Sequence, residues 1–177
     1  MSDDPNAPRA PALVPYSPVD ACLEVPIDAI EATLALLRAA GARESGLFWY
    51  GPRAGAGGVV RSIRAPRQVM HPFNYTVDTA ALSEMTAGLP DDFRTLAQIH
   101  SHPGPSVEHS RYDDEMVGSR RALSLVFPNY GLVTRAWPQG VGVHEFQDGY
   151  WHLLTDDEAA ARVRLTPRAD IERLDFR

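Results

Sequence analysis

The sequence predicts one α+β domain with a three-layer-like arrangement, in which two or three helices flank a curved, mixed, largely antiparallel sheet. Three observations lead to this prediction. The chain has 177 residues, which suffice for one good core but would crowd two full domains. Strand-like and helix-like segments alternate along it. The pair Asp148-Gly149 between two apolar runs is typical of a tight turn in an antiparallel hairpin.

The composition divides the chain into three parts. Residues 1–20 are rich in proline and acidic residues, so we expect them to be extended or disordered. Residues 21–165 carry the alternating segments and are expected to form the domain itself. Residues 166–177 are a charged C-terminal tail, which we expect to form a short helix at most.

The first elements follow from short apolar patterns. An apolar run at 21–26 predicts a strand, and apolar residues at broadly helical spacing predict an amphipathic helix over 26–40 that ends at Gly41. The run GLFWYG at 46–51 is expected to be a buried strand. A glycine-rich turn then joins it to VVRSIRAP at 59–66, so these two segments are expected to form a hairpin.

The second half of the domain begins with an irregular stretch at 67–78. A helix is expected after it, capped by Asp78 or Thr79 and ending near Gly88. The remaining helices are expected at 110–122 and 156–161, and the remaining strands at 95–101, 123–127, 132–137, 141–147, 150–153 and 163–165.

Charge and composition exclude several classes of function. The formal net charge is −6, from 23 acidic and 17 basic residues, and the basic residues are scattered. No basic run would supply an electrostatic footprint for nucleic acid, so protein or small-molecule partners are favoured. No apolar run approaches the length of a membrane span, and the N-terminal segment lacks the pattern of a signal peptide. Cys22 is the only cysteine, which fits a reducing compartment, so a soluble cytoplasmic protein is the expectation.

Two histidines on one strand suggest a metal site. His100 and His102 are two residues apart, so both imidazoles project from the same face of the strand, with Cβ atoms about 6–7 Å apart. Asp113 can supply a third ligand from the start of the following helix, where it lies three residues after Ser110. Two histidines, one carboxylate and a water form the open tetrahedral zinc site of a hydrolase.

Each half of this pattern also has a structural explanation. Ser110-x-x-Asp113 alone resembles a helix capping box, and His-x-His on a strand is more often surface or core than a metal site. The conjunction of the two in a strand, loop and helix start favours the metal site.

These residues resemble the motif of a known family. His100-Ser101-His102-Pro103, followed by Ser110-Arg111-Tyr112-Asp113, is similar to the motif of the JAMM (MPN-plus, prokaryotic JAB) zinc metalloisopeptidases. That family also has an upstream glutamate followed by glycine and apolar residues, and Glu44 in Arg43-Glu44-Ser45-Gly46-Leu47-Phe48 matches it. The resemblance spans about residues 21 to 155. It implies a single MPN/JAB domain over 21–165.

The resemblance assigns a role to each motif residue. His100, His102 and Asp113 would bind zinc, which lowers the pKa of a bound water towards about 7. Glu44 would be the general base that takes a proton from the water and returns it to the leaving amine. Ser110 would donate a hydrogen bond to the oxyanion of the tetrahedral intermediate.

The resemblance also suggests a substrate and partners. It implies an isopeptidase or peptidase that processes or deconjugates a ubiquitin-like protein at its C-terminal tail. The bacterial members that look like this chain belong to ubiquitin-like conjugation operons, including antiviral defence systems, so activating and conjugating enzymes are expected partners. Two alternatives remain: a peptidase acting on a sulfur-carrier protein or other small peptides, and a non-catalytic MPN scaffold. Specificity would lie in the loops at 66–94 and 114–140, which carry no readable code.

The other histidines are interpreted more simply. His109 is predicted to lie on a loop surface, and His71 is expected to pack within the irregular stretch rather than to bind substrate. His144 and His152 are expected to be ordinary sheet residues, since Asp148 stands where a His-Glu-x-x-His motif would need its second histidine. The three tryptophans are expected in the core: Trp49, Trp137 and Trp151.

Overall fold

The computed structural model of the chain describes residues 9–133 and 136–177. In chain order the elements are β1 (Leu23–Pro26), α1 (Ile27–Ala39), β2 (Gly46–Ala54), β3 (Gly57–Val59), β4 (Ser62–Ala65), β5 (Val69–Met70), β6 (Tyr75–Thr76), α2 (Thr79–Thr86), β7 (Phe93–Ser101), α3 (Arg111–Met116), β8 (Leu123–Phe127), the short 3₁₀ helix η1 (Asn129–Gly131), β9 (Gly142–Gln147), β10 (Tyr150–Leu153), α4 (Asp156–Arg162), β11 (Val163–Thr166) and β12 (Glu172–Asp175).

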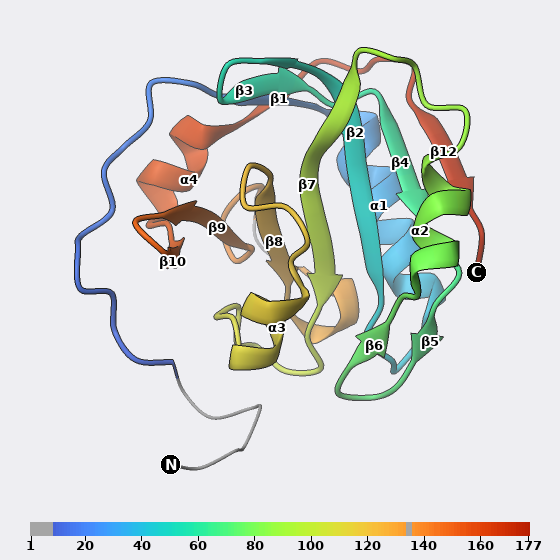
Figure 1. Ribbon diagram of the computed structural model, residues 1–177, viewed down its shortest axis with the longest axis horizontal. Coiled ribbons are helices and arrows are strands. Elements are labelled where there is room, and N and C mark those ends of the chain that lie inside the picture. The colour runs from blue at the N-terminus through green and yellow to red at the C-terminus, as the bar shows by residue number, and fades with distance from the viewer. Residues whose placement is uncertain (1–8, 134–135) are drawn as a thin grey trace.

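Most strands belong to one curled sheet with the order β10-β9-β8-β7-β2-β3-β1-β11, and β4 and β12 extend it beside β2 (Figure 1). The sheet is mixed. The pairs β7–β8, β1–β3, β1–β11 and β4–β12 are parallel, and the other pairs are antiparallel. β5 and β6 form a separate two-stranded hairpin. The predicted α+β class with a curved mixed sheet in a single domain is confirmed.

β2 and β7 form the centre of the sheet and set the position of the site. Their antiparallel register places Gly46 opposite His100, so the loop that precedes β2 lies beside the end of β7. β7 is buried from Leu96 to its end, because its sequence TLAQIHS puts side chains against packed layers on both faces. Behind the sheet, the Trp49 indole on β2 donates a hydrogen bond of 2.8 Å to the Thr33 hydroxyl on α1. The end of β7 is therefore held on a rigid scaffold.

The helices cover different parts of the sheet. α1 runs behind β2 and β4, and α2 lies beside β4 and β12 (Figure 1). α4 lies above β9 and β10 in the same view. α3 is short and lies in front of the ends of β7 and β8. The expectation of a helix over 110–122 is wrong at its C-terminal end. The Gln98 side chain on β7 donates to the Met116 carbonyl and accepts from the Gly118 N–H, so it satisfies the backbone where the helix ends.

The C-terminal tail is a second correction. Residues 172–175 form β12, a strand parallel to β4, where a short helix was expected. The Arg64 side chain on β4 is almost fully buried, and its guanidinium donates to the Glu172 carboxylate on β12 at 2.8 Å. A buried guanidinium requires such a partner, so the tail completes the sheet.

Two other expectations concern less regular parts of the chain. Residues 9–20 form neither helix nor strand, and the rest of the segment 1–20 lies outside the described residues. The strand expected at 132–137 includes 134–135, which also lie outside them, and the described residues of that range are not in a strand.

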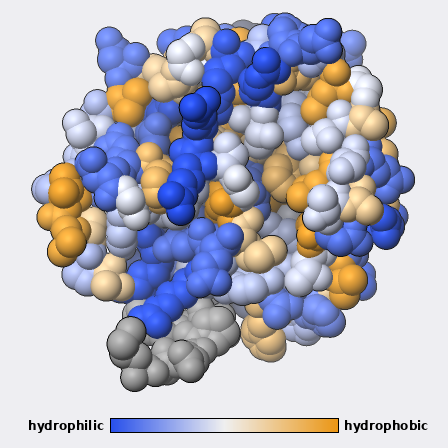
Figure 2. Space-filling model, in the orientation of Figure 1, coloured by the Kyte–Doolittle hydropathy of each residue, from blue (hydrophilic) through white to orange (hydrophobic). Residues whose placement is uncertain are grey.

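The surface is mixed in character. Figure 2 shows hydrophobic residues scattered among hydrophilic ones across the face seen in Figure 1, as is usual for a protein surface. Among the described residues, no helix has the length and apolar character needed to cross a membrane.

Candidate metal centre

The two histidines of the motif meet at the end of β7. The Nε2 atoms of His100 and His102 lie 3.1 Å apart, on the same face of the chain as the strand period requires. His100 is buried with 2% of its surface exposed, and His102 is partly exposed. One side of this pair is therefore packed within the protein and the other faces solvent.

Asp113 approaches the histidines from the first turn of α3. Its carboxylate oxygens lie 3.3 Å from His100 Nε2 and 3.4 Å from His102 Nε2. The same residue is the third helical position of a capping box with Ser110. The capping interpretation and the metal-site interpretation of the sequence therefore describe one geometry, because the cap fixes Asp113 where it faces both imidazoles.

The three side chains fit a tetrahedral metal ion. One ligand atom from each of His100, His102 and Asp113 lies within 4.8 Å of the others. Ligands about 2.0–2.1 Å from zinc at tetrahedral angles are about 3.3–3.4 Å from one another. The two Nε2 atoms, 3.1 Å apart, are close to that spacing, and each lies 3.3 or 3.4 Å from a different oxygen of the Asp113 carboxylate. The donor set is also one that zinc accepts.

Hydrogen bonds fix the protonation of these ligands. His102 Nδ1 lies 3.1 Å from the Ser106 carbonyl, which can only accept, so Nδ1 carries a proton and Nε2 is the nitrogen that a metal ion would use. Burial acts to raise the pKa of Asp113, but the charge of His100, hydrogen bonds with both imidazoles and the Ser110 backbone N–H hold that pKa far below its ordinary value. Asp113 is thus ionised, as a metal ligand must be.

Glu44 lies beside the ligands in the loop before β2. Its backbone N–H donates to the His71 carbonyl in the β5–β6 turn, which fixes the loop. The residue is 7% exposed, and burial raises the pKa of its carboxyl to about 7; His102 opposes this rise and Asp113 adds to it. A carboxyl with a pKa near neutrality is suited to general base catalysis.

A cleft joins these groups to solvent. Its volume is about 530 Å³, within the range of sites for small molecules and peptide segments. Its lining residues come from the loop before β2, the β5–β6 turn, the loop after β7 and the start of α3: Glu44, Phe73, Asn74, His102, Pro103, Gly104, Pro105, Ser106, Ser110, Tyr112 and Asp113. The predicted base, the predicted oxyanion donor and two metal ligands therefore border one space.

Comparisons with known proteins address the fold. A scan against protein-family models finds no match, and a search of curated proteins finds none. Among solved structures, the chain is similar to the protein DSY2949 from Desulfitobacterium hafniense, with a TM-score of 0.52 and 17% identity over 84% of this chain and 95% of that one. It also aligns with AF2198, a JAB1/MPN domain protein from Archaeoglobus fulgidus, with a TM-score of 0.44 and 15% identity over 79% of this chain and 97% of that one. The likeness to DSY2949 shows a shared fold.

His109 is a correction to the sequence analysis. It was expected on a loop surface, but it is only 4% exposed. Its Nδ1 lies 2.9 Å from an Asp114 carboxylate oxygen, and its Nε2 lies 2.8 Å from the Ser124 hydroxyl on β8. The carboxylate can only accept, so Nδ1 carries the proton and Nε2 accepts from Ser124. Burial and the nearby His100 lower the pKa of His109 well below its ordinary value, so the ring is neutral.

His109 belongs to a buried network behind the ligands. Its ring stacks on His144 of β9 at 3.8 Å between centroids and lies 5.9 Å from the His100 ring. His144 Nε2 donates to the Val107 carbonyl at 2.8 Å, which fastens the loop after β7 to β9. Arg9 from the N-terminal segment forms an ion pair with Asp114 at 2.7 Å. This network supports the loop and helix that carry Asp113.

The β5–β6 hairpin differs in part from its predicted form. The stretch at 67–78 was expected to be irregular, with His71 packed, but the His71 side chain is exposed in the hairpin turn. Phe73 is 72% exposed and lines the cleft. Tyr75 is only 7% exposed, because its ring packs on Gly46, where an added Cβ would lie 2.2 Å from the Tyr75 Cε2 atom. Gly46 therefore leaves room for the tyrosine beside the site.

Proposed function

We propose that the chain is a zinc-dependent peptidase of the JAMM type. The observation that carries the proposal is the grouping of three side chains, each with a ligand atom within 4.8 Å of the others, beside a buried glutamate with a pKa of about 7. His100, His102 and Asp113 would hold the ion. A zinc ion bound there would act as a Lewis acid and supply a nucleophilic water at neutral pH.

The residues around the ligands would carry the proton and orient the substrate. Ionised Glu44 accepts a proton from the attacking water and delivers it to the leaving amine when the amide bond breaks. The Ser110 hydroxyl borders the cleft and donates to an Asp113 oxygen at 2.8 Å. In the proposed mechanism it donates instead to the substrate carbonyl oxygen as negative charge develops there. Burial of Glu44 and His100 keeps competing water from these groups.

The proposed substrate is the C-terminal tail of a ubiquitin-like protein. A thin, extended tail fits a cleft of about 530 Å³ that opens beside the exposed Phe73. The loop Pro103-Gly104-Pro105 borders the other side and presents no bulky side chain. The motif resemblance supports processing or deconjugation within a bacterial conjugation system, whose activating and conjugating enzymes are the proposed partners.

Metal content and amide hydrolysis test the catalytic proposal together. The purified chain should carry about one zinc per chain, and the double variant His100→Ala, His102→Ala should carry none. His71→Ala is the matched control, since this histidine is exposed in the β5–β6 turn. Cleavage of a ubiquitin-like protein with a C-terminal extension should be lost only in the double variant. Unchanged zinc in that variant, measured by elemental analysis, would contradict the assignment.

A further inference from the structure

A second cavity lies at the opposite end of β7 from the metal centre. Its volume is about 390 Å³. Its lining residues come from the end of β2, the β2–β3 turn, the loop before β8, β9 and the end of α4: Arg53, Gly55, Ala56, Arg120, Arg121, Ala122, Glu145, Phe146 and Arg162. Arg53 also donates to the carbonyl of Thr95, which is separated from His100 by roughly 17 Å of strand. The cavity is therefore distinct from the cleft of the proposed peptidase site.

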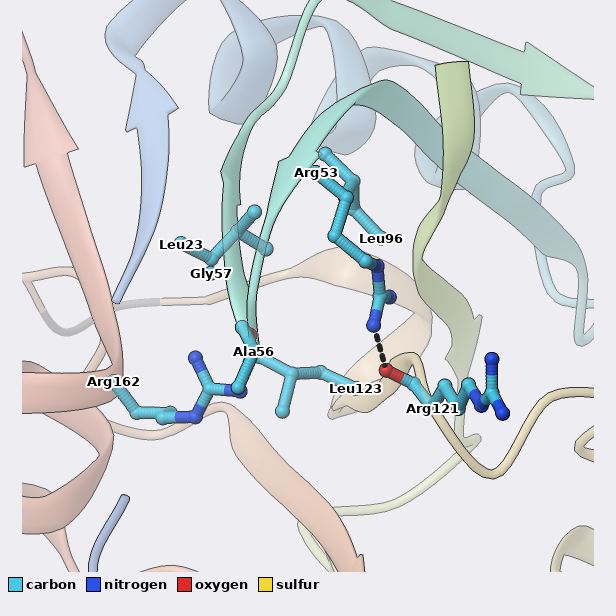
Figure 3. A pocket seen from close by; sticks show the side chains of 8 residues that line it. All are labelled: Leu23, Arg53, Ala56, Gly57, Leu96, Arg121, Leu123 and Arg162. Carbon is cyan, nitrogen blue, oxygen red and sulfur yellow. Dashed lines mark hydrogen bonds between the residues drawn. The ribbon is translucent and has the colours of Figure 1, made fainter. Parts of the chain in front are cut away.

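A narrow recess adjoins this cavity and is shown in Figure 3. Its volume is about 10 Å³, enough for about one water molecule, and it shares Arg53, Ala56, Arg121 and Arg162 with the larger space. In Figure 3 the Arg53 guanidinium points to the Arg121 carbonyl, to which it donates at 2.7 Å. The carbonyls of Arg121 and Thr95 that accept from Arg53 are neutral, so they hold the guanidinium in place without neutralising its charge.

Arg162 has a structural explanation. Its guanidinium pairs with both carboxylate oxygens of Glu145, at 2.8 and 2.9 Å. It also donates to the carbonyls of Ala21 and Ala56, which ties α4 to β1 and to the β2–β3 turn. The residue is 4% exposed and its charge is compensated. Arg162 therefore closes the curled sheet and is not available to a ligand.

The other three arginines of the cavity carry uncompensated charge. Within the described part of the chain, Arg53, Arg120 and Arg121 form no ion pair with a carboxylate, and the single acid of the lining is committed to Arg162. The Arg120 guanidinium lies 4.8 Å from the centre of the Phe146 ring. Burial lowers the pKa of Arg53, and the like charges of Arg162 and Arg121 lower it further. The lining therefore gathers positive charge in a chain whose net charge is −6.

We propose that this cavity binds a small phosphate-bearing anion with at least two negative charges. Guanidinium groups donate pairs of hydrogen bonds that match the oxygens of a phosphate, and a bound anion would neutralise the positive charge that Arg53, Arg120 and Arg121 bring to the lining. The volume is that of a small-molecule site. Arg53, Arg120 and Arg121 all line one concave space with an aromatic wall at Phe146, whereas nucleic-acid binding requires a basic stripe along a face. This inference does not depend on the proposed peptidase activity.

Calorimetric titration of the full chain with inorganic pyrophosphate tests the proposal. The wild-type chain should bind it, and the affinity should fall as ionic strength rises. Arg120→Gln and Arg121→Gln should each raise the Kd about tenfold, the cost of one charged hydrogen-bonding group. Both side chains are exposed, so the variants should fold. Arg173→Gln is the matched control, since Arg173 is exposed on β12 outside the cavity, and its Kd should stay at the wild-type value.

A second titration identifies the source of the phosphate. Tighter binding of ADP than of pyrophosphate would assign the site to a nucleotide, and equal binding would assign it to the phosphates alone. An absence of pyrophosphate binding at millimolar concentration would overturn the proposal, and so would an unchanged Kd in the double variant Arg120→Gln, Arg121→Gln. Binding of a hexaglutamate peptide with no binding of either phosphate compound would also overturn it, because the site would then serve an acidic protein segment.

Discussion

Three hydrogen bonds join Ser110 and Asp113 at the start of α3. The Ser110 N–H and hydroxyl donate to one Asp113 carboxylate oxygen at 2.7 and 2.8 Å, and the Asp113 N–H donates to the Ser110 hydroxyl oxygen at 3.2 Å. The same carboxylate faces both imidazoles of the metal centre. One side chain thus belongs both to the cap and to the cluster that could hold a metal ion, and substitutions can separate the two proposed roles.

Asp113→Asn should separate metal binding from capping. The amide oxygen can still accept from Ser110, so the cap should remain. The charge that both imidazoles favour is lost, so the free energy of unfolding of the metal-free protein should fall, and zinc affinity should fall sharply because the anionic ligand is lost. Asp113→Ala should lose the cap as well and cost about 1 kcal/mol more than Asp113→Asn. Zinc titration and chemical denaturation measure the two effects.

The capping box of α4 provides the control for this comparison. Thr155 and Glu158 form the same reciprocal contacts there, so Glu158→Ala should cost about as much stability as the loss of the α3 cap and should leave zinc affinity unchanged. Wild-type zinc affinity in Asp113→Asn would remove Asp113 from the ligand set.

Glu44→Gln should separate metal binding from chemistry. The substitution removes the proposed base and leaves His100, His102 and Asp113 in place, so bound zinc should remain near one per chain while hydrolysis falls about 10²–10⁴-fold. Elemental analysis and turnover on the same preparation provide the two measurements. Near-normal turnover in the variant would show that another group takes the proton.

The raised pKa of Glu44 predicts a pH dependence of stability in the metal-free protein. Its folded pKa of about 7 exceeds the ordinary value of 4.5, so folding favours the protonated form. The contribution of the group to stability is fully present below pH 4.5 and is lost as the pH rises through about 7. Glu44→Gln removes this dependence. The variant should therefore gain stability relative to the wild type between pH 5 and pH 8 in denaturation measurements, and a constant difference would contradict the assignment.

Glu172 predicts the opposite pH dependence at the other end of the chain. A hydrogen bond from Ser62 and the interactions with Arg64 lower the pKa of the Glu172 carboxyl below its ordinary value of 4.5. Partial burial acts in the opposite direction but is outweighed. Its contribution is therefore present above pH 4.5 and is lost as the pH falls through the lower folded value. Glu172→Gln should cost roughly 1–3 kcal/mol at pH 7, because it leaves the buried Arg64 without its charged partner.

Denaturation from pH 7 to pH 3 checks this prediction, since the difference between wild type and Glu172→Gln should shrink as the pH falls. The exposed pair Arg164–Glu24 supplies the control. Glu24→Gln should cost less than about 0.5 kcal/mol. An equally small cost for Glu172→Gln would mean that β12 does not stabilise the sheet through Arg64.

The metal centre could be predicted from the sequence because its signals are local. His100 and His102 share a face through the two-residue period of a strand, and Ser110 and Asp113 share the first turn of a helix. The one non-local feature that had to be inferred is the packing of the start of α3 against the end of β7. In the structure, one potential ligand atom from each of His100, His102 and Asp113 lies within 4.8 Å of the others. Glu44 reaches the same cleft because β2 pairs with β7 in the register that places Gly46 opposite His100.

The features that escaped prediction depend on contacts between distant segments. His109 is buried because Ser124 of β8 and His144 of β9 surround its ring, and neither follows from the sequence around it. β12 has no apolar alternation, and its residues are exposed, so its identity as a strand comes from pairing with β4. α3 ends early because Gln98, on another element, satisfies its last backbone groups. In each case tertiary contacts override local propensity.

The last prediction concerns how a protein substrate is held. Phe73 is 72% exposed at the mouth of the cleft, whereas Met70 lies within the β5–β6 hairpin and does not border it. If the folded body and tail of a ubiquitin-like protein bind across the cleft, they should cover the Phe73 ring, whose burial is worth about 1.5–3 kcal/mol. Phe73→Ala should then raise KM about tenfold or more and change kcat little, because this contact is the same in the ground state and the transition state. Met70→Ala should have a smaller effect on KM.

Steady-state cleavage of a ubiquitin-like protein fused to a C-terminal reporter checks this prediction, with a peptide that copies only the tail as the second substrate. Leu165→Ala is the control, since Leu165 is 44% exposed on β11 and lies outside the cleft. The fusion should be cut efficiently and the bare tail poorly, since most of the binding energy comes from the folded protein. The effect of Phe73→Ala should appear only with the fusion. Two outcomes would instead assign the chain to the general peptidases: equal efficiency on both substrates, or an intact fusion together with rapid hydrolysis of unrelated peptides. In either case recognition would depend on the scissile bond and not on the body of a protein substrate.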